Sequence, residues 1–309
     1  MTPPVTSRFH GIYPSTLCPF REDYTIDAQA LEAHVGGLAT ISGIAGILCN
    51  GHAGENFLLS REEKARVVRI SRQAMGTRGL LVAGVVNEDS LAAAEEARDA
   101  IAAGADAVMI FAPFSWVLSQ DEGMALRHHS IICAAVERPV MLFQGSVRAG
   151  RMAYPPAVLS KLLSLPNLVA IKEGSWETAA YEATRRQVRA EAPHVAVMAS
   201  GDEHLLACYV LGSEGSLVSL AVLIPEVIVA LDATVRRGDM PAARAAHDVV
   251  YPLARAIYGA PVGGATMRLK ACLHLLGRLP NALARPPSGP LDREEMLTLS
   301  RLLTQVGLR

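Results

Sequence analysis

The run Leu168-Val169-Ala170-Ile171-Lys172-Glu173-Gly174, residues 168–174, decides the fold. Its first four residues are apolar without the alternation of a half-exposed strand, which is typical of a parallel strand buried beneath helices. The same character recurs at Gly11–Tyr13, Ala45–Asn50, Leu80–Val85, Ala107–Phe111, Val140–Gln144, Val195–Ser200 and Ser216–Leu220. Together with Leu168–Lys172, these runs predict eight parallel strands.

Stretches with helical periodicity separate these strands, and most begin with Ser, Asp or Pro, which favour helix N-termini. They are Asp27–Thr40, Ser60–Met75, Ser90–Ala103, Asp121–Ala135, Pro155–Leu165, Trp176–Ala190 and Glu203–Leu211. Such alternation is typical of an open doubly wound sheet or a closed barrel. Eight units favour an α/β fold of the (β/α)8 TIM barrel type, and Pro14–Pro19 after the first strand lacks a dinucleotide-binding Gly-x-Gly-x-x-Gly.

The pattern becomes purely helical after Pro225. The helices expected there are Pro225–Arg237, Met240–Tyr258, Gly263–Leu276 and Asp292–Val306. We therefore expect a barrel over residues 1–225 that carries the active site, and a C-terminal helical domain over residues 226–309.

The composition excludes several classes of protein. The 309 residues are 50% apolar, and 29 basic residues balance 30 acidic ones, which gives no electrostatic footprint for nucleic acid. Residues 1–14 lack the features of a secretory signal and no apolar run is long enough to span a membrane, so we expect a cytoplasmic protein. The five cysteines contain no CxxC pair, which predicts reduced thiols and no metal site.

The residue most suited to chemistry is Lys172, which ends the sixth expected strand, where barrel enzymes place their active sites. The apolar residues before it would hold its side chain in an apolar interior, where lost hydration lowers the pKa of the amine. A free amine can attack a carbonyl and form an imine. The alternative is a lysine that extends to the barrel mouth and pairs with Glu173.

A second candidate feature is the turn Asn50-Gly51-His52-Ala53-Gly54-Glu55-Asn56 after the second strand. Its two glycines let backbone N–H groups converge on an anion. A 2-oxo acid carries a carboxylate beside the carbonyl that Lys172 would attack. The alternative is an ordinary glycine-containing loop.

These motifs together resemble the dihydrodipicolinate synthase and N-acetylneuraminate lyase family of Schiff-base aldolases and hydro-lyases, in a divergent form. The resemblance covers nearly the whole chain. Its motifs are Thr16–Phe20, Gly51–Glu55, Lys172-Glu173, Ser200-Gly201-Asp202, Gly212 with Gly215, and Lys270 to Arg285-Pro286-Pro287. It implies a (β/α)8 barrel with a helical C-terminal domain, usually a homotetramer, a Schiff-base lysine at Lys172, and no cofactor beyond that imine.

The resemblance also implies that residues 51–54 bind the carboxylate of the 2-oxo acid. The family commonly has Gly-Thr-Thr-Gly-Glu there, whereas His52 and Ala53 replace the two hydroxyl residues in this chain. The backbone donors of the turn can survive that exchange, whereas the side-chain hydroxyls are lost. A neutral His52 could donate to the carboxylate or move a proton, or it could merely fill the rim.

The larger departure is Phe143, which stands where the family usually has a tyrosine that shuttles protons. Phenylalanine has no group that can act as an acid or base. Three interpretations follow. Water, His52 or the substrate carboxylate moves the proton; the reaction differs from the best-known ones; or catalysis has been lost.

Three further residues come from the same comparison. Arg148 falls where synthases keep an arginine for a second carboxylate, or it is a plain surface residue. Trp116, near a tyrosine position of the synthases, suggests with Phe143 an apolar pocket for an aromatic portion, or it is core packing. The backbone carbonyl of about Leu217 is expected to face the lysine.

Two groups of polar residues have simpler interpretations. Asp202, Glu203 and His204 resemble a metal cluster, but we expect Asp202 to cap a helix. His128 and His129 lie in the middle of a helix, and we expect them to face solvent.

We therefore predict a lyase, an aldolase or dehydratase, that forms a Schiff base with a 2-oxo acid such as pyruvate, a 2-keto-3-deoxy sugar acid or an aromatic aldol adduct. The alternatives are 4-hydroxy-tetrahydrodipicolinate synthase, a catalytically silent barrel that binds a 2-oxo acid, and a purely structural role. We expect a small-molecule substrate, a homo-oligomer (tetramer or dimer), and neither nucleic acid nor membrane as partner.

Overall fold

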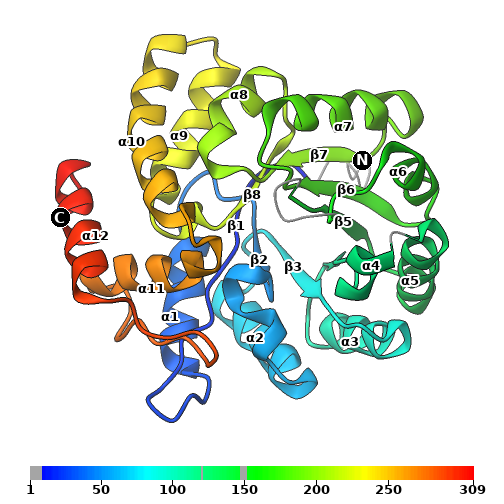
Figure 1. Ribbon diagram of the computed structural model, residues 1–309, viewed down its shortest axis with the longest axis horizontal. Coiled ribbons are helices and arrows are strands. Elements are labelled where there is room, and N and C mark those ends of the chain that lie inside the picture. Colours follow the sequence, from blue (N-terminus) through cyan, green and yellow to red (C-terminus); the bar gives the residue numbers. More distant parts are fainter. Residues whose placement is uncertain (1–8, 120, 147–151) are drawn as a thin grey trace.

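The computed structural model describes residues 9–119, 121–146 and 152–309 and forms a ring of parallel strands surrounded by helices (Figure 1). The strands are β1 (Gly11–Pro14), β2 (Gly46–Cys49), β3 (Leu80–Val85), β4 (Ala107–Ile110), β5 (Val140–Gln144), β6 (Leu168–Glu173), β7 (Ala196–Ala199) and β8 (Gly215–Val218). Their order is β1-β8-β7-β6-β5-β4-β3-β2. Bridges Ile12–Ile44 and Ser15–Leu48 close the ring between β1 and β2, so the predicted (β/α)8 fold is confirmed.

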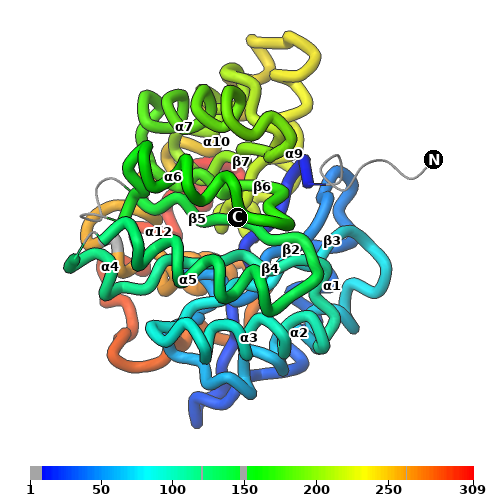
Figure 2. Tube along the Cα trace, turned by 90° about the vertical axis from the view of Figure 1, so that its right-hand side faces the viewer, coloured from blue at the N-terminus to red at the C-terminus, as the bar shows by residue number. Residues whose placement is uncertain are grey.

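Helices alternate with the strands as expected. They are α1 (Ala28–Ala39), α2 (Arg61–Met75), α3 (Ser90–Ala102), α4 (Phe114–Ser119), α5 (Glu122–Ala135), α6 (Pro156–Leu163), α7 (Thr178–Glu191) and α8 (Leu205–Val210). Side chains of Asp27, Ser60, Asp89 and Asp121 cap four of them, which is why the expected starts were close. In Figure 2, α3, α5, α6 and α7 follow one another around the barrel. The short helix α4 was not expected.

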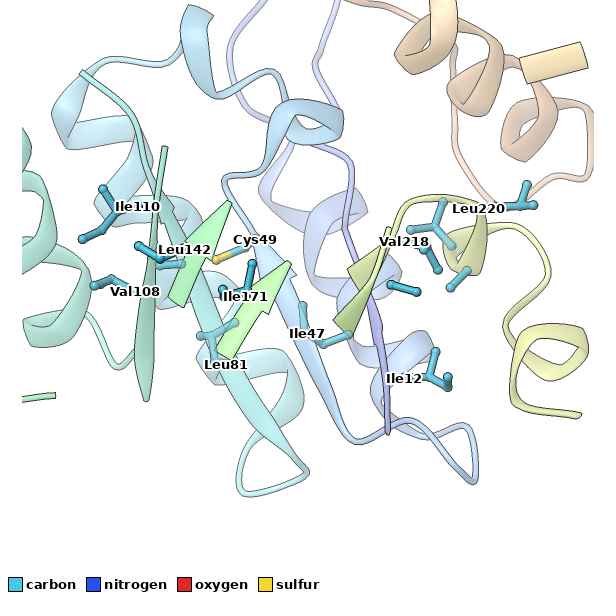
Figure 3. Packing of buried hydrophobic residues seen from close by; sticks show 14 of the residues in the cluster. Ile12, Ile47, Cys49, Leu81, Val108, Ile110, Leu142, Ile171, Val218 and Leu220 are labelled. Carbon is cyan, nitrogen blue, oxygen red and sulfur yellow. The ribbon is translucent and has the colours of Figure 1, made fainter. Parts of the chain in front are cut away.

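Two apolar clusters divide the core. The outer cluster joins strand residues such as Ile47, Leu81 and Ile171 (Figure 3) to the inner faces of the helices. The inner cluster fills the barrel with strand residues, among them Met109, Met141, Met198 and Leu217, without a contribution from any of the α-helices described. Successive strand residues point to opposite sides, so Ile171 faces the helices while Lys172 points into the barrel.

The chain after β8 is helical, with α9 (Pro225–Arg236), α10 (Met240–Tyr258), α11 (Ala265–Leu275) and α12 (Arg293–Gln305). Helix α9 packs beside α8 and against β1, while α11 contacts the turn that follows β2. The division at residues 225 and 226 stays a prediction. In the described part of the chain, no helix is long and apolar enough to cross a membrane.

The expectation that His128 and His129 face solvent is wrong, because their exposed fractions are 1% and 0%. Helix α5 packs against both α3 and α6, so a large part of its surface is buried. His128 Nδ1 lies 3.0 Å from Ser90 Oγ, and His129 Nε2 lies 3.0 Å from the Tyr154 hydroxyl. Both histidine side chains are therefore buried between α5 and the segments that pack against it.

Candidate active site

The structure places Lys172 at the end of β6 with its side chain inside the barrel mouth. Its register partners are Phe143 on β5 and Met198 on β7, and Nζ lies 5.5 Å from the centre of the Phe143 ring. The residue is only 8% exposed. Burial lowers the pKa of Lys172 to about 8, although the carboxylate of Asp202 acts in the opposite direction. A minor fraction of the amine is therefore free at neutral pH, and the free form becomes the major one above pH 8.

Glu173 does not pair with Lys172, because the next residue of a strand points to the opposite side. Its Oε2 accepts a hydrogen bond of 2.9 Å from Ser175 Oγ, and Thr184 Oγ1 donates to Oε1 at 3.5 Å. Burial raises the pKa of Glu173 to about 7. Within the described residues, Lys172 has no ion pair or hydrogen bond that would keep its amine charged.

The turn after β2 is shaped by backbone geometry that few residues tolerate. Asn50 and Glu55 adopt left-handed φ angles of 51° and 57° on either side of the short 3-10 helix η2 (His52–Gly54). A Cβ atom on Gly51 would lie 2.8 Å from Ser15 Oγ, and one on Gly54 would lie 3.1 Å from the Thr16 carbonyl. A 3-10 turn leaves its first N–H groups without partners inside the turn, so this loop can hold a carboxylate.

A buried ion pair anchors this turn to the C-terminal helices. Lys270 of α11 donates to Glu55 Oε1 and also, at 2.7 Å, to the carbonyl of Leu283. The backbone N–H of Arg285 donates to Glu55 Oε2 at 2.9 Å. The side chains of Lys270 and Glu55 are 1% and 6% exposed, and the Phe20 ring lies under both cations, 4.3 Å from Lys270 and 4.7 Å from Arg285.

Aromatic rings continue from Lys172 to the surface. Phe143 lies 4.8 Å from Phe111 and 5.3 Å from His52, and the His52 ring lies 4.7 Å from Phe57. Phe57 in turn lies 5.1 Å from Phe114, and both of these rings are exposed. They follow β2 and β4 in the 3-10 helix η3 (Asn56–Leu58) and in α4. The mouth of the barrel beside the turn is therefore lined with aromatic rings.

His52 is held neutral in this surrounding. Burial, with the nearby charge of Lys172, lowers the pKa of His52 to about 3. A neutral imidazole at physiological pH can donate one hydrogen bond to a carboxylate. It takes up a proton only in strong acid, so it is poorly suited to carry one during turnover.

Asp202 does not cap a helix, so that expectation is wrong. The 3-10 helix η4 (Asp202–His204) begins after Gly201 without a side-chain cap. Asp202 Oδ2 instead accepts hydrogen bonds from the Leu220 N–H at 2.9 Å and the Tyr258 hydroxyl at 2.7 Å. Tyr258 belongs to α10 and was missed in the sequence, because no local pattern connects it with the strand ends.

The remaining expected residues have different outcomes. The side chain of Leu217 fills the barrel interior, and Ala53 packs partly buried in the turn. Trp116 does not line the mouth: its ring is fully buried in the outer cluster, 5.1 Å from the ring of Tyr154, which lies just before α6. Arg148 lies outside the described residues.

Comparisons with known proteins identify the family and agree with the fold. A family model described as "Dihydrodipicolinate synthetase family" matches residues 8–306. A relative in Escherichia coli K12, named "Putative 2-dehydro-3-deoxy-D-gluconate aldolase YagE", is 26% identical, covering 99% of this chain and 99% of the relative. The 4-hydroxy-tetrahydrodipicolinate synthase of Moorella thermoacetica is 30% identical over 96% of this chain and 98% of its own.

Among solved structures, YagE of Escherichia coli K12 in complex with pyruvate superimposes with a TM-score of 0.89. It is 25% identical, and the match covers 97% of this chain and 99% of that one.

The buried pair of Lys270 and Glu55 makes a testable prediction. In Lys270→Met the Glu55 carboxylate stays buried without its cation, so we expect the free energy of unfolding in urea to fall by about 3–5 kcal/mol. The double variant Glu55→Gln/Lys270→Met should recover much of that loss. The control is Lys161→Met, whose half-exposed pair with Glu122 at 2.6 Å should contribute no more than about 1 kcal/mol. An equal loss in Lys270→Met and Lys161→Met would contradict the anchoring role.

Proposed function

Because the chain belongs to the dihydrodipicolinate synthetase family, we propose that it is a lyase that forms a Schiff base between Lys172 and a 2-oxo acid. The observation that supports this most is Lys172 itself, an amine with a pKa lowered to about 8 at the end of β6. A buried lysine in this state is a nucleophile for carbonyl carbon.

The proposed reaction uses the two features of the mouth together. The Gly54 N–H donates to the Gly51 carbonyl within the turn, so the backbone N–H groups of His52 and Ala53 hold the C1 carboxylate, with the His52 ring as a further neutral donor. The Lys172 amine forms a bond to C2, and the carbonyl oxygen leaves as water. The resulting iminium accepts the electron pair of the C3–C4 bond when the aldol cleaves, while the C4 hydroxyl loses its proton to a base. Protonation at C3 and hydrolysis then release the shorter 2-oxo acid and restore Lys172.

The substrate we propose carries an apolar, preferably aromatic, portion beyond C4. The rings of Phe57, Phe111, Phe114 and Phe143 present an aromatic wall beside Lys172. A sugar acid would need partners for several hydroxyl groups, which these rings do not offer. The 4-hydroxy-tetrahydrodipicolinate synthase reaction is less well supported, because Phe143 and Ala53 lack the hydroxyls that the resemblance leads one to expect.

We further propose that the imine is the only electron sink, so that no metal or organic cofactor takes part. A cytoplasmic location and a homo-oligomeric state complete the proposal.

The first test is to trap the imine. Incubation with pyruvate followed by borohydride should add one reduced pyruvyl group, located on Lys172 by peptide mass spectrometry. Lys172→Ala should acquire none, while its circular dichroism spectrum stays unchanged. If the folded wild-type protein forms no adduct with pyruvate or with larger 2-oxo acids, the lyase proposal is wrong.

The trapping rate should also depend on pH. Because the folded pKa of Lys172 is about 8, the fraction of free amine rises with pH below 8 and levels off above it. Short incubations between pH 6 and pH 10, all quenched into borohydride at one common pH, should give a rate that increases up to about pH 8 and does not rise further. A rise that continues to pH 10 would mean that burial does not shift the pKa of this lysine.

Substrate choice tests the aromatic wall. We expect kcat/KM for 4-hydroxy-4-phenyl-2-oxobutanoate to exceed that for 2-dehydro-3-deoxy-D-gluconate. Phe57→Ala should reduce the first value about tenfold or more, as expected when the burial of a ring is lost, and leave the trapping of pyruvate unchanged. Tyr251→Ala removes an exposed ring on α10 as the control. A preference for the sugar acid would refute the aromatic assignment.

A further inference from the structure

Imine formation and aldol cleavage both require a group that gives and takes protons near Lys172. Phe143 cannot do so, and His52 is a poor carrier because its pKa is lowered to about 3. Another titratable group lies just after β7, the strand next to β6. This is Asp202, with Tyr258 bound to it.

The position of Asp202 follows from the strand register. Lys172 and Glu173 of β6 pair with Met198 and Ala199 of β7, and Asp202 follows three residues later, where β7 opens into the mouth. Its exposed fraction is 2%. The charges of Asp202 and Lys172 act on each other's proton affinity, although the two groups form no direct ion pair among the described residues. The carboxyl group is therefore within electrostatic reach of the amine without being bonded to it.

Two hydrogen bonds hold this carboxylate in place, and further contacts fix one of the donors, Tyr258. The Leu220 N–H, after β8, donates to Oδ2 at 2.9 Å, and the Tyr258 hydroxyl donates to the same oxygen at 2.7 Å. Ser219 Oγ lies 2.5 Å from the Tyr258 oxygen, and the Trp176 ring packs 4.7 Å from the Tyr258 ring. Both bonds to Asp202 end on Oδ2, which leaves Oδ1 less engaged and able to exchange a proton.

If the hydrogen bonds of Asp202 with Leu220 and Tyr258 had only a structural role, they would not require an ionisable side chain. An asparagine oxygen could accept the same two bonds from Leu220 and Tyr258. Burying a carboxyl group in its charged form costs free energy, and an asparagine at this position would avoid that cost. A proton carrier, however, requires an ionisable group near the amine. A further titratable group that interacts with Asp202 is Tyr209, whose hydroxyl is 2.7 Å from Ser216 Oγ. Burial raises the pKa of both tyrosines far above neutral pH, so neither competes for the proton.

We propose that Asp202 is the proton carrier for the chemistry of Lys172 and that Tyr258 is the residue that positions it. This inference rests on the proposed function. One proton is shared between the amine and the carboxyl group at the start. The neutral amine forms its bond to C2 while Asp202 protonates the carbonyl oxygen. The Asp202 carboxylate then removes a proton from the nitrogen that is now bonded to C2. It passes this proton to the C2 hydroxyl, which leaves as water. The iminium and the Asp202 carboxylate remain, so atoms and charge balance.

The same carboxylate is then placed to accept the proton of the C4 hydroxyl when the C3–C4 bond breaks. It returns that proton to C3 of the enamine. Asp202 therefore takes the role that the resemblance assigns to a tyrosine at the position of Phe143.

The test uses the full chain and the pyruvate trapping reaction described above. In Asp202→Asn the bonds to Leu220 and Tyr258 can persist, and we expect the trapping rate to fall about 100-fold, as for loss of a general acid–base. In Tyr258→Phe the carboxylate loses a donor, and the rate should fall about tenfold. The pyruvate concentration for half-maximal rate should change less than twofold in both. The matched control is Tyr154→Phe, which removes a buried hydroxyl bound to His129 and should trap at the wild-type rate.

Rescue of Asp202→Ala by an added carboxylic acid distinguishes a role in proton transfer from a structural role. Formate should restore part of the trapping rate in Asp202→Ala in proportion to its concentration, while chloride should not. A wild-type rate in folded Asp202→Asn, or the absence of rescue by formate, would overturn the role of Asp202 and leave the proposed function intact. If Asp202→Asn does not fold, an unchanged rate in Tyr258→Phe overturns the proposal instead. The absence of any adduct in the wild-type protein would refute the proposed function itself.

Discussion

The active site depends on a buried ion pair that joins residues far apart in the chain. Lys270 and Glu55 are 215 positions apart, and nearly all of both side chains is withdrawn from water. Breaking such a pair leaves a buried charge without compensation, which is why its geometry is held strongly. Glu55 is also the residue with a left-handed φ angle that ends the turn proposed to bind the carboxylate. The C-terminal helices therefore support the proposed active site, because they fix the turn after β2 through Glu55.

The proposed chemistry at the barrel mouth depends on Lys172, a second buried amine, which has no direct counterion among the described residues. Its surrounding is apolar, so the amine loses its proton easily. Phe143 and the other rings exclude water from the nucleophile, and they also remove the hydroxyl groups that would carry protons. An acid–base group must then come from another part of the mouth. In the proposed mechanism that group is Asp202, which is held by a hydrogen bond from Tyr258.

Local patterns in the sequence were sufficient to predict the barrel. The apolar runs of the strands and the capping residues of the helices act over a few positions, and Lys172 could be recognised because it ends such a run. Long-range contacts could not be recognised in this way. Tyr258 meets Asp202 across 56 positions, and no periodicity connects them. His128 and His129 were misjudged because helix α5 is covered on two sides, which depends on where α3 and α6 pack.

The most direct test of this account is a crystal structure of the protein after reduction with pyruvate and borohydride. We predict continuous density from Lys172 Nζ to C2 of the reduced pyruvyl group. Its carboxylate should lie about 3 Å from the backbone nitrogens of the Gly51–Gly54 turn, and Asp202 should be the acidic side chain nearest to the new bond. An unmodified Lys172, or an adduct whose carboxylate points away from that turn, would contradict the account.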